Sequence, residues 1–321
     1  MPVPESDISV LIPTYRYRDK VARALESALA SGAGEIIVVD DRSCDGTLEL
    51  LAGYKDARLQ VYENSQNLGL WENHLRALSY AKKPWIKFIQ ADDYLCDGGL
   101  ARYAAAVMPG VTVVWSCASV VDDGNGAVSH YNTISKPTLV DGDTILRACV
   151  FSGWILGSPS HMMVRSDVIS RDPAAWKTEL SADIVLGSIA AAQGSVVLLP
   201  SGALIQGAHE RQDAKVQGYY RGLRRMVGTS EYLSSCPEAA LRSFAGLWAM
   251  LNMPLVLRLV AIGVLWGKVP PLEAFRLMLR NIMLARATKI DRIFLKAAKA
   301  NRRRASIPCD IDEVLRRLEA N

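Results

Sequence analysis

The fold is decided by the stretch from Ile36 to Thr47, which reads IIVVDDRSCDGT. Its first four residues are apolar and β-branched, and they predict a buried strand. Two carboxylates, Asp40 and Asp41, follow at once, and turn residues come next. This pattern is typical of a parallel strand that ends in a ligand-binding loop. A solvated loop in which Ser43 or Asp45 caps the next helix would have the same pattern.

Strands and helices alternate on both sides of this stretch. Apolar runs predict strands at 8–12, 59–62 and 85–89, and helical spacing predicts helices at 21–29, 48–51 and 70–81. The alternation predicts an α/β fold with a mostly parallel sheet and helices on both faces. Ligands of such sheets bind beyond the carboxyl ends of the strands. We therefore expect the chemistry to lie at 13–17, 40–45 and 90–93.

The later part of the chain is less regular. It predicts strands at 111–116 and 196–199, a hairpin turn at DDGNG (122–126) and a helix at 184–192. From about Gly218 onward the pattern is helical. We therefore predict an α/β domain over 1–217 and a basic helical region over 218–321.

Charge is distributed unevenly along the 321 residues, although the net charge is only +4. Residues 221–321 hold 18 of the 37 basic and 8 of the 33 acidic residues, which leaves 19 basic and 25 acidic residues before them. An acidic first part suits a cation site, and a basic last part suits a phosphate-rich surface such as anionic lipid. The composition, 50% hydrophobic and 22% charged, excludes a disordered chain.

The most apolar stretch, 245–267, is interrupted by Asn252, Pro254 and Arg258. A charged arginine near the centre of a membrane span costs about 2.5–3.5 kcal/mol, so we expect a buried or interfacial helical hairpin instead of a span. Apolar residues then alternate with arginines over 275–286, and more basic residues follow. This pattern fits a helix on an anionic membrane surface and, equally, the solvated basic face of a packed helix.

The thiol and targeting patterns favour the cytoplasm. None of the six cysteines forms a C-x-x-C pair, and no apolar signal segment follows Met1. We therefore expect reduced thiols and a cytoplasmic protein, and the basic end leaves a peripheral place on the inner face of the membrane open. No nucleic-acid partner is expected, and a homodimer stays open.

A second acidic pair, Asp92 and Asp93, follows another predicted strand in FIQADDY (88–94). Carboxylates can hold a divalent cation that offsets the charge of a diphosphate leaving group, and Mg²⁺ usually takes one or two protein carboxylates. A capping loop is again the structural alternative. However, two acidic pairs at neighbouring strand ends repel each other unless a cation or hydrogen-bond donors offset their charge.

Four motifs, in this order, resemble those of glycosyltransferase family 2, whose members have the Rossmann-like GT-A fold. They are ISVLIPTY at 8–15, IIVVDDRSCDGT at 36–47, NLG at 67–69 with Asn73, and QADD at 90–93. The match is strong over about 7–100 and continues weakly to about 213. The resemblance implies an enzyme that takes a sugar from a UDP- or dTDP-linked donor with the help of Mg²⁺ or Mn²⁺.

The resemblance implies roles at the nucleotide. Pro13 and Tyr15 would line the base pocket, with Tyr15 near the base ring. Asp41 would contact the base, and Asp40 would support the loop that carries it.

The resemblance places the metal at QADD, where the family has its D-x-D motif. Asp92 matches the last acid, which binds the metal that bridges the diphosphate, and Asp93 adjoins it. Gln90 replaces the first acid; its amide can hydrogen-bond a ribose hydroxyl but brings no charge. His209, in IQGAHER (205–211), stands where the family often has Y-R-x-H, whose histidine approaches the metal or the diphosphate. A plain loop histidine is the alternative.

The segment LSADI (180–184) opens a predicted helix and resembles the family segment that carries the catalytic base. Asp183 would deprotonate the acceptor hydroxyl as it attacks the anomeric carbon, which inverts the configuration. An acid that only stabilises the helix N-terminus is the alternative, and Glu179 is the fallback base. Trp154 is the candidate for stacking an acceptor sugar. Structural or surface positions are expected for His74, His130 and His161.

Absent motifs narrow the choice of function. The Q-x-x-R-W motif and the several spans of the family's processive synthases are missing, which favours addition of a single sugar. No G-x-G-x-x-G motif follows the first strand, and PTYR (13–16) is not the phosphate loop of a nucleotidyltransferase. We expect an inverting transfer to a saccharide or lipid-linked saccharide in cell-surface polysaccharide biosynthesis. The alternative is an inactive GT-A-like module that binds a nucleotide or a partner.

Overall fold

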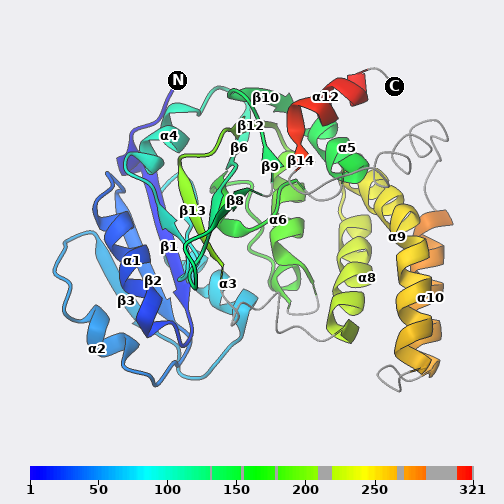
Figure 1. The fold of residues 1–321 in the computed structure, drawn as a ribbon, viewed down its shortest axis with the longest axis horizontal. Coiled ribbons are helices and arrows are strands. Elements are labelled where there is room, and N and C mark those ends of the chain that lie inside the picture. Colours follow the sequence, from blue (N-terminus) through cyan, green and yellow to red (C-terminus); the bar gives the residue numbers. More distant parts are fainter. Residues whose placement is uncertain are drawn as a thin grey trace.

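The computed structural model describes residues 1–130, 132–152, 155–177, 180–208, 219–265, 271–286 and 309–319. Its centre is an eight-stranded mixed sheet in the order β10-β12-β6-β11-β4-β1-β2-β3 (Figure 1). The strands are β1 (Ile8–Thr14), β2 (Glu35–Asp40), β3 (Leu59–Glu63), β4 (Trp85–Phe88), β6 (Val111–Ser116), β10 (Thr138–Asp141), β11 (Met162–Arg165) and β12 (Ser195–Leu199).

Helices cover both faces of this sheet, and each face has its own hydrophobic cluster. One face packs against α1 (Arg18–Leu29), α2 (Thr47–Leu51) and α4 (Gly99–Ala105). The other face packs against α3 (Leu70–Tyr80), α5 (Gly142–Ser152) and α6 (Ala182–Ala191). The short 3-10 helices are η1 (Glu5–Asp7), η2 (Pro159–His161) and η3 (Pro173–Trp176). The predicted α/β fold with two covered faces is confirmed.

The first half of the sheet is parallel. β1 pairs with β2 and with β4, and β2 pairs with β3, all in the parallel sense. β1, β2 and β4 are buried along their whole length, which explains their nearly continuous apolar runs. Because parallel strands end at the same edge, the loops after β1, β2 and β4 lie next to one another.

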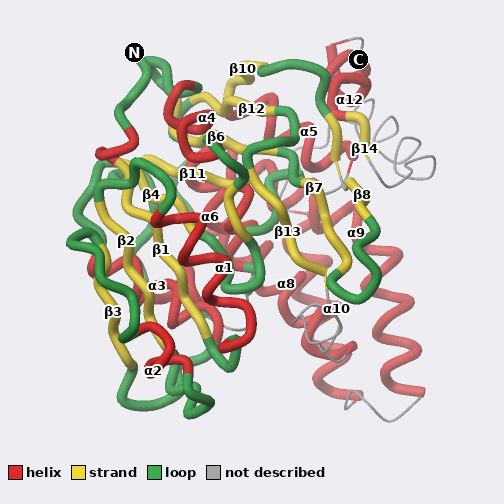
Figure 2. Tube along the Cα trace, turned by 60° about the vertical axis from the view of Figure 1, so that its left-hand side comes forward, coloured by secondary structure: helices red, strands yellow, loops and turns green. Residues whose placement is uncertain are grey.

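Antiparallel strands complete the structure. β11 runs antiparallel to both β4 and β6, and β10 runs antiparallel to β12. A second sheet joins β5 (Tyr94–Leu95), β13 (Leu204–Ala208), β7 (Ser119–Asp122) and β8 (Val128–His130) beside the first (Figure 2). The hairpin turn predicted at 122–126 is confirmed between β7 and β8.

The helical region begins with α8 (Tyr219–Ser235), α9 (Ala239–Leu265) and α10 (Pro271–Arg286), which pack side by side (Figure 1). Leu233, Leu241 and Phe244 of α8 and α9 belong to the same hydrophobic cluster as α3 and α6. The chain then returns, because α12 (Ile311–Glu319) packs on α5 and β14 (Cys309–Asp310) pairs with β9 (Asn132–Thr133). The α/β part and the helical region thus share a hydrophobic cluster, and the domain boundary at 218 stays a prediction. Among the described helices, none is long and apolar enough to cross a bilayer.

Candidate active site

The site predicted from the sequence lies at the carboxyl edge of the parallel strands. β2 and β4 flank β1 in the sheet. Neighbouring strands lie about 4.8 Å apart, so the ends of β2 and β4 lie about 10 Å from each other. Asp40 ends β2 and Asp41 follows it, while Gln90 and Asp92 follow β4. The strand order therefore brings both acidic pairs to one edge of the molecule.

The carboxylate of Asp41 holds a neighbouring loop closed. Its Oδ1 accepts hydrogen bonds from Asn64 Nδ2 and from the Leu68 N–H, both at 2.8 Å, and its Oδ2 accepts one from the Gly69 N–H at 2.8 Å. The residue is 1% exposed. Asn64 also donates to Asn73 Oδ1 at 2.9 Å, which ties the loop to α3. Asp41 thus fixes the entry into α3, and its contact with a base stays a prediction.

Asp40 fixes the loop that follows β2. Its carboxylate accepts from the Ser43 N–H at 2.9 Å and from the Ser43 hydroxyl. Burial raises the pKa of Asp40, and the two bonds from Ser43 act in the opposite direction. The Ser43 oxygen in turn accepts from the Arg16 N–H at 2.8 Å. The loops after β1 and β2 are therefore joined through one carboxylate and one hydroxyl.

Backbone conformations of high energy gather around this edge. Four non-glycine residues of the described chain have positive φ: Arg16, Arg42, Cys44 and Ser158. The first three lie in the loops after β1 and β2, and the fourth precedes η2. Such conformations cost on the order of 1–3 kcal/mol each and cluster at functional sites.

β1 presents the predicted base-pocket residues at the same edge. Pro13 is buried within the strand, whereas Tyr15 is 39% exposed just beyond it. The guanidinium carbon of Arg16 lies 5.3 Å from the centre of the Tyr15 ring. Thr14 lies between Pro13 and Tyr15 in the chain, and its buried hydroxyl oxygen has no hydrogen-bond partner among the described residues. An orphaned polar group of this kind is open to a ligand.

His74 of α3 orients the side chain of Gln90. The His74 Nδ1 lies 2.6 Å from the Leu70 carbonyl oxygen, and its Nε2 lies 2.7 Å from the Gln90 side-chain oxygen Oε1. Burial lowers the pKa of His74 to about 4, so the ring is neutral at pH 7 and carries one N–H. Both ring nitrogens thus face oxygen atoms, and a neutral ring donates its one N–H to only one of them. The Gln90 Oε1 faces His74.

Asp92 and Asp93 have different environments. The Asp92 side chain is half-buried, whereas Asp93 is buried and accepts a hydrogen bond from the Gly207 N–H at 3.0 Å. Asp93 also lies beside the buried Lys87, and burial raises the pKa of Asp93 and lowers that of Lys87. Asp93 therefore anchors the loop to β13, and its predicted role as a metal ligand does not fit this placement, because its oxygens face the protein interior.

Asp183 lies in the first turn of α6, and its side chain is partly buried. Burial raises its pKa, while the N–H groups of Ile184 and Ser158 and the charge of Arg225 favour the carboxylate. Arg225 comes from α8. The hydroxyl oxygen of Thr229, also in α8, accepts a hydrogen bond from the Ser181 N–H at 2.9 Å. The helical region thus braces the acid.

A short segment joins the two acidic parts of the site. The Ser158 N–H donates to Asp183, and two residues later the Ser160 hydroxyl accepts from the Gln90 N–H at 2.8 Å. Three consecutive residues span about 7 Å at most between their Cα atoms, so this short segment connects Asp183 with Gln90. That the two belong to one active site stays a prediction.

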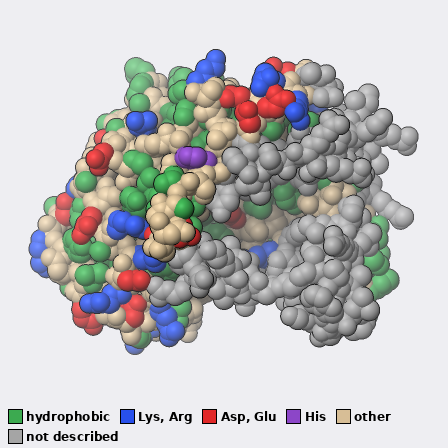
Figure 3. Space-filling model, in the orientation of Figure 1, with side chains coloured by type: hydrophobic (Ala, Val, Ile, Leu, Met, Phe, Trp, Pro, Cys, Tyr) green, Lys and Arg blue, Asp and Glu red, His purple; other side chains and the backbone are tan. Residues whose placement is uncertain are grey.

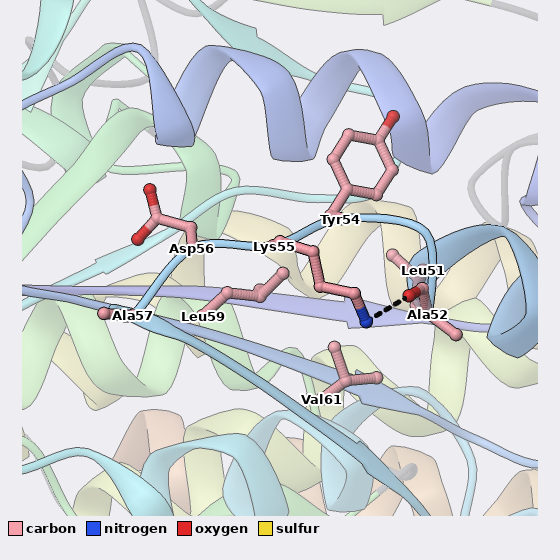
Figure 4. A pocket seen from close by; sticks show the side chains of 8 residues that line it. All are labelled: Leu51, Ala52, Tyr54, Lys55, Asp56, Ala57, Leu59 and Val61. Atoms are coloured by element: carbon pink, nitrogen blue, oxygen red, sulfur yellow. Dashed lines mark hydrogen bonds between the residues drawn. The ribbon is translucent and has the colours of Figure 1, made fainter.

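The described surface has hollows at two places that bear on the site. One, of about 620 Å³, lies between α3, η3, α8 and α10. The other, of about 460 Å³, lies where the α2–β3 turn meets β3, and its Lys55 ammonium donates to the Ala52 carbonyl (Figure 4). This second hollow is at the amino end of β3, away from the predicted chemistry, and we assign it no role in catalysis.

The model of "Glycosyl transferase family 2" matches residues 9–170, just over half of the chain. The chain belongs to glycosyltransferase family 2. This match spans the loops of Asp41 and Asp92 but ends before Asp183.

Similar proteins support this assignment. The succinoglycan biosynthesis protein ExoO of Rhizobium meliloti is 33% identical over 30% of this chain and 28% of its own length. The UDP-Glc:alpha-D-GlcNAc-diphosphoundecaprenol beta-1,3-glucosyltransferase WfaP of Escherichia coli is 34% identical over 27% of this chain and 36% of its own. The chain thus aligns with about a third of these curated relatives. S. aureus TarS 1–349, solved with UDP-GlcNAc, has the same fold, with a TM-score of 0.67 and 17% identity over 98% of this chain and 90% of that one.

Some predicted residues lie outside the described part of the chain, namely His209, Glu179 and Trp154. Other residues contribute to the site but were not singled out from the sequence: Asn64, His74, Lys87 and Ser160. Of these, only Asn64 could have been predicted from the sequence. It is a polar residue directly after the third strand, as Asp40 is a polar residue at the end of the second.

The pH dependence of stability tests the burial of the two interior histidines. Burial lowers the pKa of both His74 and His161 to about 4, below the ordinary 6.5. The histidines of the unfolded state therefore bind protons at a higher pH than those of the folded state. The folded protein is most stable, with respect to these two groups, above pH 6.5. Its free energy of unfolding decreases as the pH drops towards 4, by on the order of 3 kcal/mol per histidine. Urea denaturation between pH 7 and 4.5 measures this.

Two variants separate the effect of the buried histidine from that of other titrating groups. His74→Gln should flatten the pH dependence, whereas His130→Gln, at a partly exposed position, should leave it as in the wild type. An unchanged slope in His74→Gln would show that this ring is not held neutral by burial.

Proposed function

We propose that this protein is an inverting glycosyltransferase that transfers a single sugar from a UDP- or dTDP-sugar to a saccharide or lipid-linked saccharide in cell-surface polysaccharide biosynthesis. The observation that carries the proposal is the segment Ser158–Ser160, which contacts Asp183 at one end and the QAD segment at the other. These contacts support a site in which Asp183 is the base for the acceptor and Asp92 the carboxylate for the diphosphate.

The chemistry of the donor site fits a divalent cation that arrives with the diphosphate. Among the described residues, no group of three or more His, Cys, Asp or Glu side chains could hold a metal by itself. Asp92 offers one half-buried carboxylate at this edge of the sheet. Mg²⁺ typically uses one or two carboxylates and completes its shell with substrate phosphates and water. When bound, Mg²⁺ or Mn²⁺ would supply positive charge to the departing diphosphate.

The residues of the chain then perform a single displacement. Pro13 and Tyr15 line the base, and the loops held by Asp40 and Asp41 fix its position. The Asp183 carboxylate takes the proton of the acceptor hydroxyl, whose oxygen forms a bond to the anomeric carbon. The bond from that carbon to the diphosphate oxygen breaks, and the nucleoside diphosphate leaves with the electron pair. Because attack comes from the side opposite the leaving group, the configuration is inverted.

The acceptor is proposed to lie in the groove of about 620 Å³. Glu72 in one wall follows three residues after Gly69, which Asp41 holds, and Leu180 in the other wall precedes Asp183 by three residues. The groove therefore opens near both halves of the site. Its polar side chains suit sugar hydroxyls or a phosphate. They are Glu72, Lys177, Glu231, Tyr232 and Arg280.

Asp183→Asn and Asp92→Asn test the two proposed roles. Loss of a general base lowers transfer by about 10²–10⁴-fold. Asp183→Asn should therefore lose transfer but bind UDP with unchanged affinity, whereas Asp92→Asn should also lose the Mn²⁺-dependent part of UDP binding. Calorimetry and a product assay with UDP-sugars measure both.

Asp167→Asn serves as the control, because Asp167 is an exposed acid paired with Arg165 at a surface. Full transfer by Asp183→Asn would refute its role as base. Nucleotide binding by the wild type without turnover on any acceptor would instead favour the inactive module.

Lys177→Gln tests the acceptor groove. Lys177 is exposed at the rim, and a hydrogen bond from a charged group contributes about 1.5–3 kcal/mol. The KM for a diphosphate-lipid-linked N-acetylglucosamine acceptor should rise about tenfold or more, and the KM for the donor should not change. Lys136→Gln, at an exposed lysine elsewhere, should leave both constants unchanged. Equal acceptor KM in the two variants would place the acceptor outside this groove.

A further inference from the structure

α10 carries a second apolar face that the protein does not cover. Leu272, Phe275, Leu279 and Met283 are 63%, 55%, 45% and 64% exposed. Their spacing of three, four and four residues places them in one stripe along the helix. We call these four residues the α10 stripe. Single exposed apolar side chains are common, but a continuous stripe of large ones marks an interaction site.

The opposite side of α10 already holds the helix in place. Leu277 and Asn281 are buried, and the Asn281 amide donates to the Ala249 carbonyl of α9 at 3.1 Å. Arg280 forms an ion pair with Glu231 of α8. The α10 stripe is therefore not the core-facing side of a loosely packed helix. It lies on the outer side of the helical region.

The figures place the stripe at the periphery. α10 is the element farthest from the central sheet in Figure 1, at the right-hand edge. Hydrophobic side chains gather at the same edge of the space-filling view (Figure 3). No described element of the chain lies beyond this edge in that view, so a flat partner could approach it.

The charge of the surrounding sequence selects the partner. Residues 268–304 contain eleven basic residues and two acidic residues, Glu273 and Asp291. Arg276, next to the stripe, is exposed. An apolar stripe within a basic segment matches the two layers of an anionic bilayer surface, with acyl chains for the stripe and phosphates for the cations. A second copy of the chain would instead bring two basic segments together.

We propose that α10 docks this protein on an anionic membrane by laying the α10 stripe into the headgroup boundary. The helix lies parallel to the surface and does not cross it. This inference goes beyond sugar transfer and does not depend on it. Leu277 and Arg280 on the inner side of α10 line the proposed acceptor groove, so docking would also bring that groove next to the membrane.

Co-sedimentation of the full chain with vesicles tests the proposal. The wild type should bind vesicles of phosphatidylcholine with 30–40% phosphatidylglycerol, and binding should weaken with added salt, since salt screens the cations. Phe275→Gln with Met283→Gln should weaken binding by about tenfold or more, because two large apolar side chains no longer enter the lipid. Thermal unfolding of both proteins checks that the variant folds.

A matched double variant controls for the loss of any exposed apolar surface. Val128 and Leu139 are 61% and 53% exposed on the α/β part, so Val128→Gln with Leu139→Gln should bind vesicles as the wild type does. Equal vesicle binding by the α10 variant and the wild type would overturn the proposal. So would a wild type that ignores the vesicles and instead forms a dimer that the α10 variant abolishes, since the stripe would then belong to a second copy.

Discussion

The carboxylate of Asp41 accepts three hydrogen bonds from the loop before α3, and these bonds hold the loop in place. Each bond from the Asn64 side chain or from the N–H groups of Leu68 and Gly69 is 2.8 Å long. Bonds to an ionised acceptor are about twice as strong as neutral ones, and this carboxylate is buried, where they are worth most. The start of α3 depends on this contact, and so do Asn73 and His74, which α3 carries into the site.

From α3 the same chain of contacts reaches the second acidic segment. His74 holds the Gln90 amide, and the Gln90 N–H is held by Ser160, which lies two residues after the Ser158 that binds Asp183. Below them, the buried Asp93 and Lys87 fix the loop from the interior. Burial of charges is costly unless they are compensated, and here the compensation is internal to the protein. The buried polar groups thus position the loops, and the half-buried Asp92 and the exposed Tyr15 stay the predicted ligand contacts.

Much of this architecture was predictable from the sequence because local signals agreed with the fold. The apolar run at 36–39 followed by two acids fixed both a buried strand and the edge at which it ends. The antiparallel strands were harder to predict: β11 has only four residues, and its MMVR sequence does not alternate. Nothing local indicates that it inserts between β4 and β6. The same limit applies to the site. Asp92 and Asp93 look alike in sequence. Only the contacts of Asp93, with Gly207 of the distant β13 and with Lys87 of the preceding β4, separate this buried anchor from the half-buried Asp92. His74 and Ser160 act through long-range contacts that no motif records.

The loops fixed by Asp40 and Asp41 and the carboxylate of Asp92 are proposed to bind one nucleotide diphosphate. A crystal structure of the full chain with UDP and Mn²⁺ tests it most directly. We expect the base beside Pro13 and Tyr15, with the diphosphate reaching the metal at Asp92. A nucleotide bound elsewhere, for example in the hollow beside β3, or a diphosphate that leaves Asp92 without a contact, would contradict it.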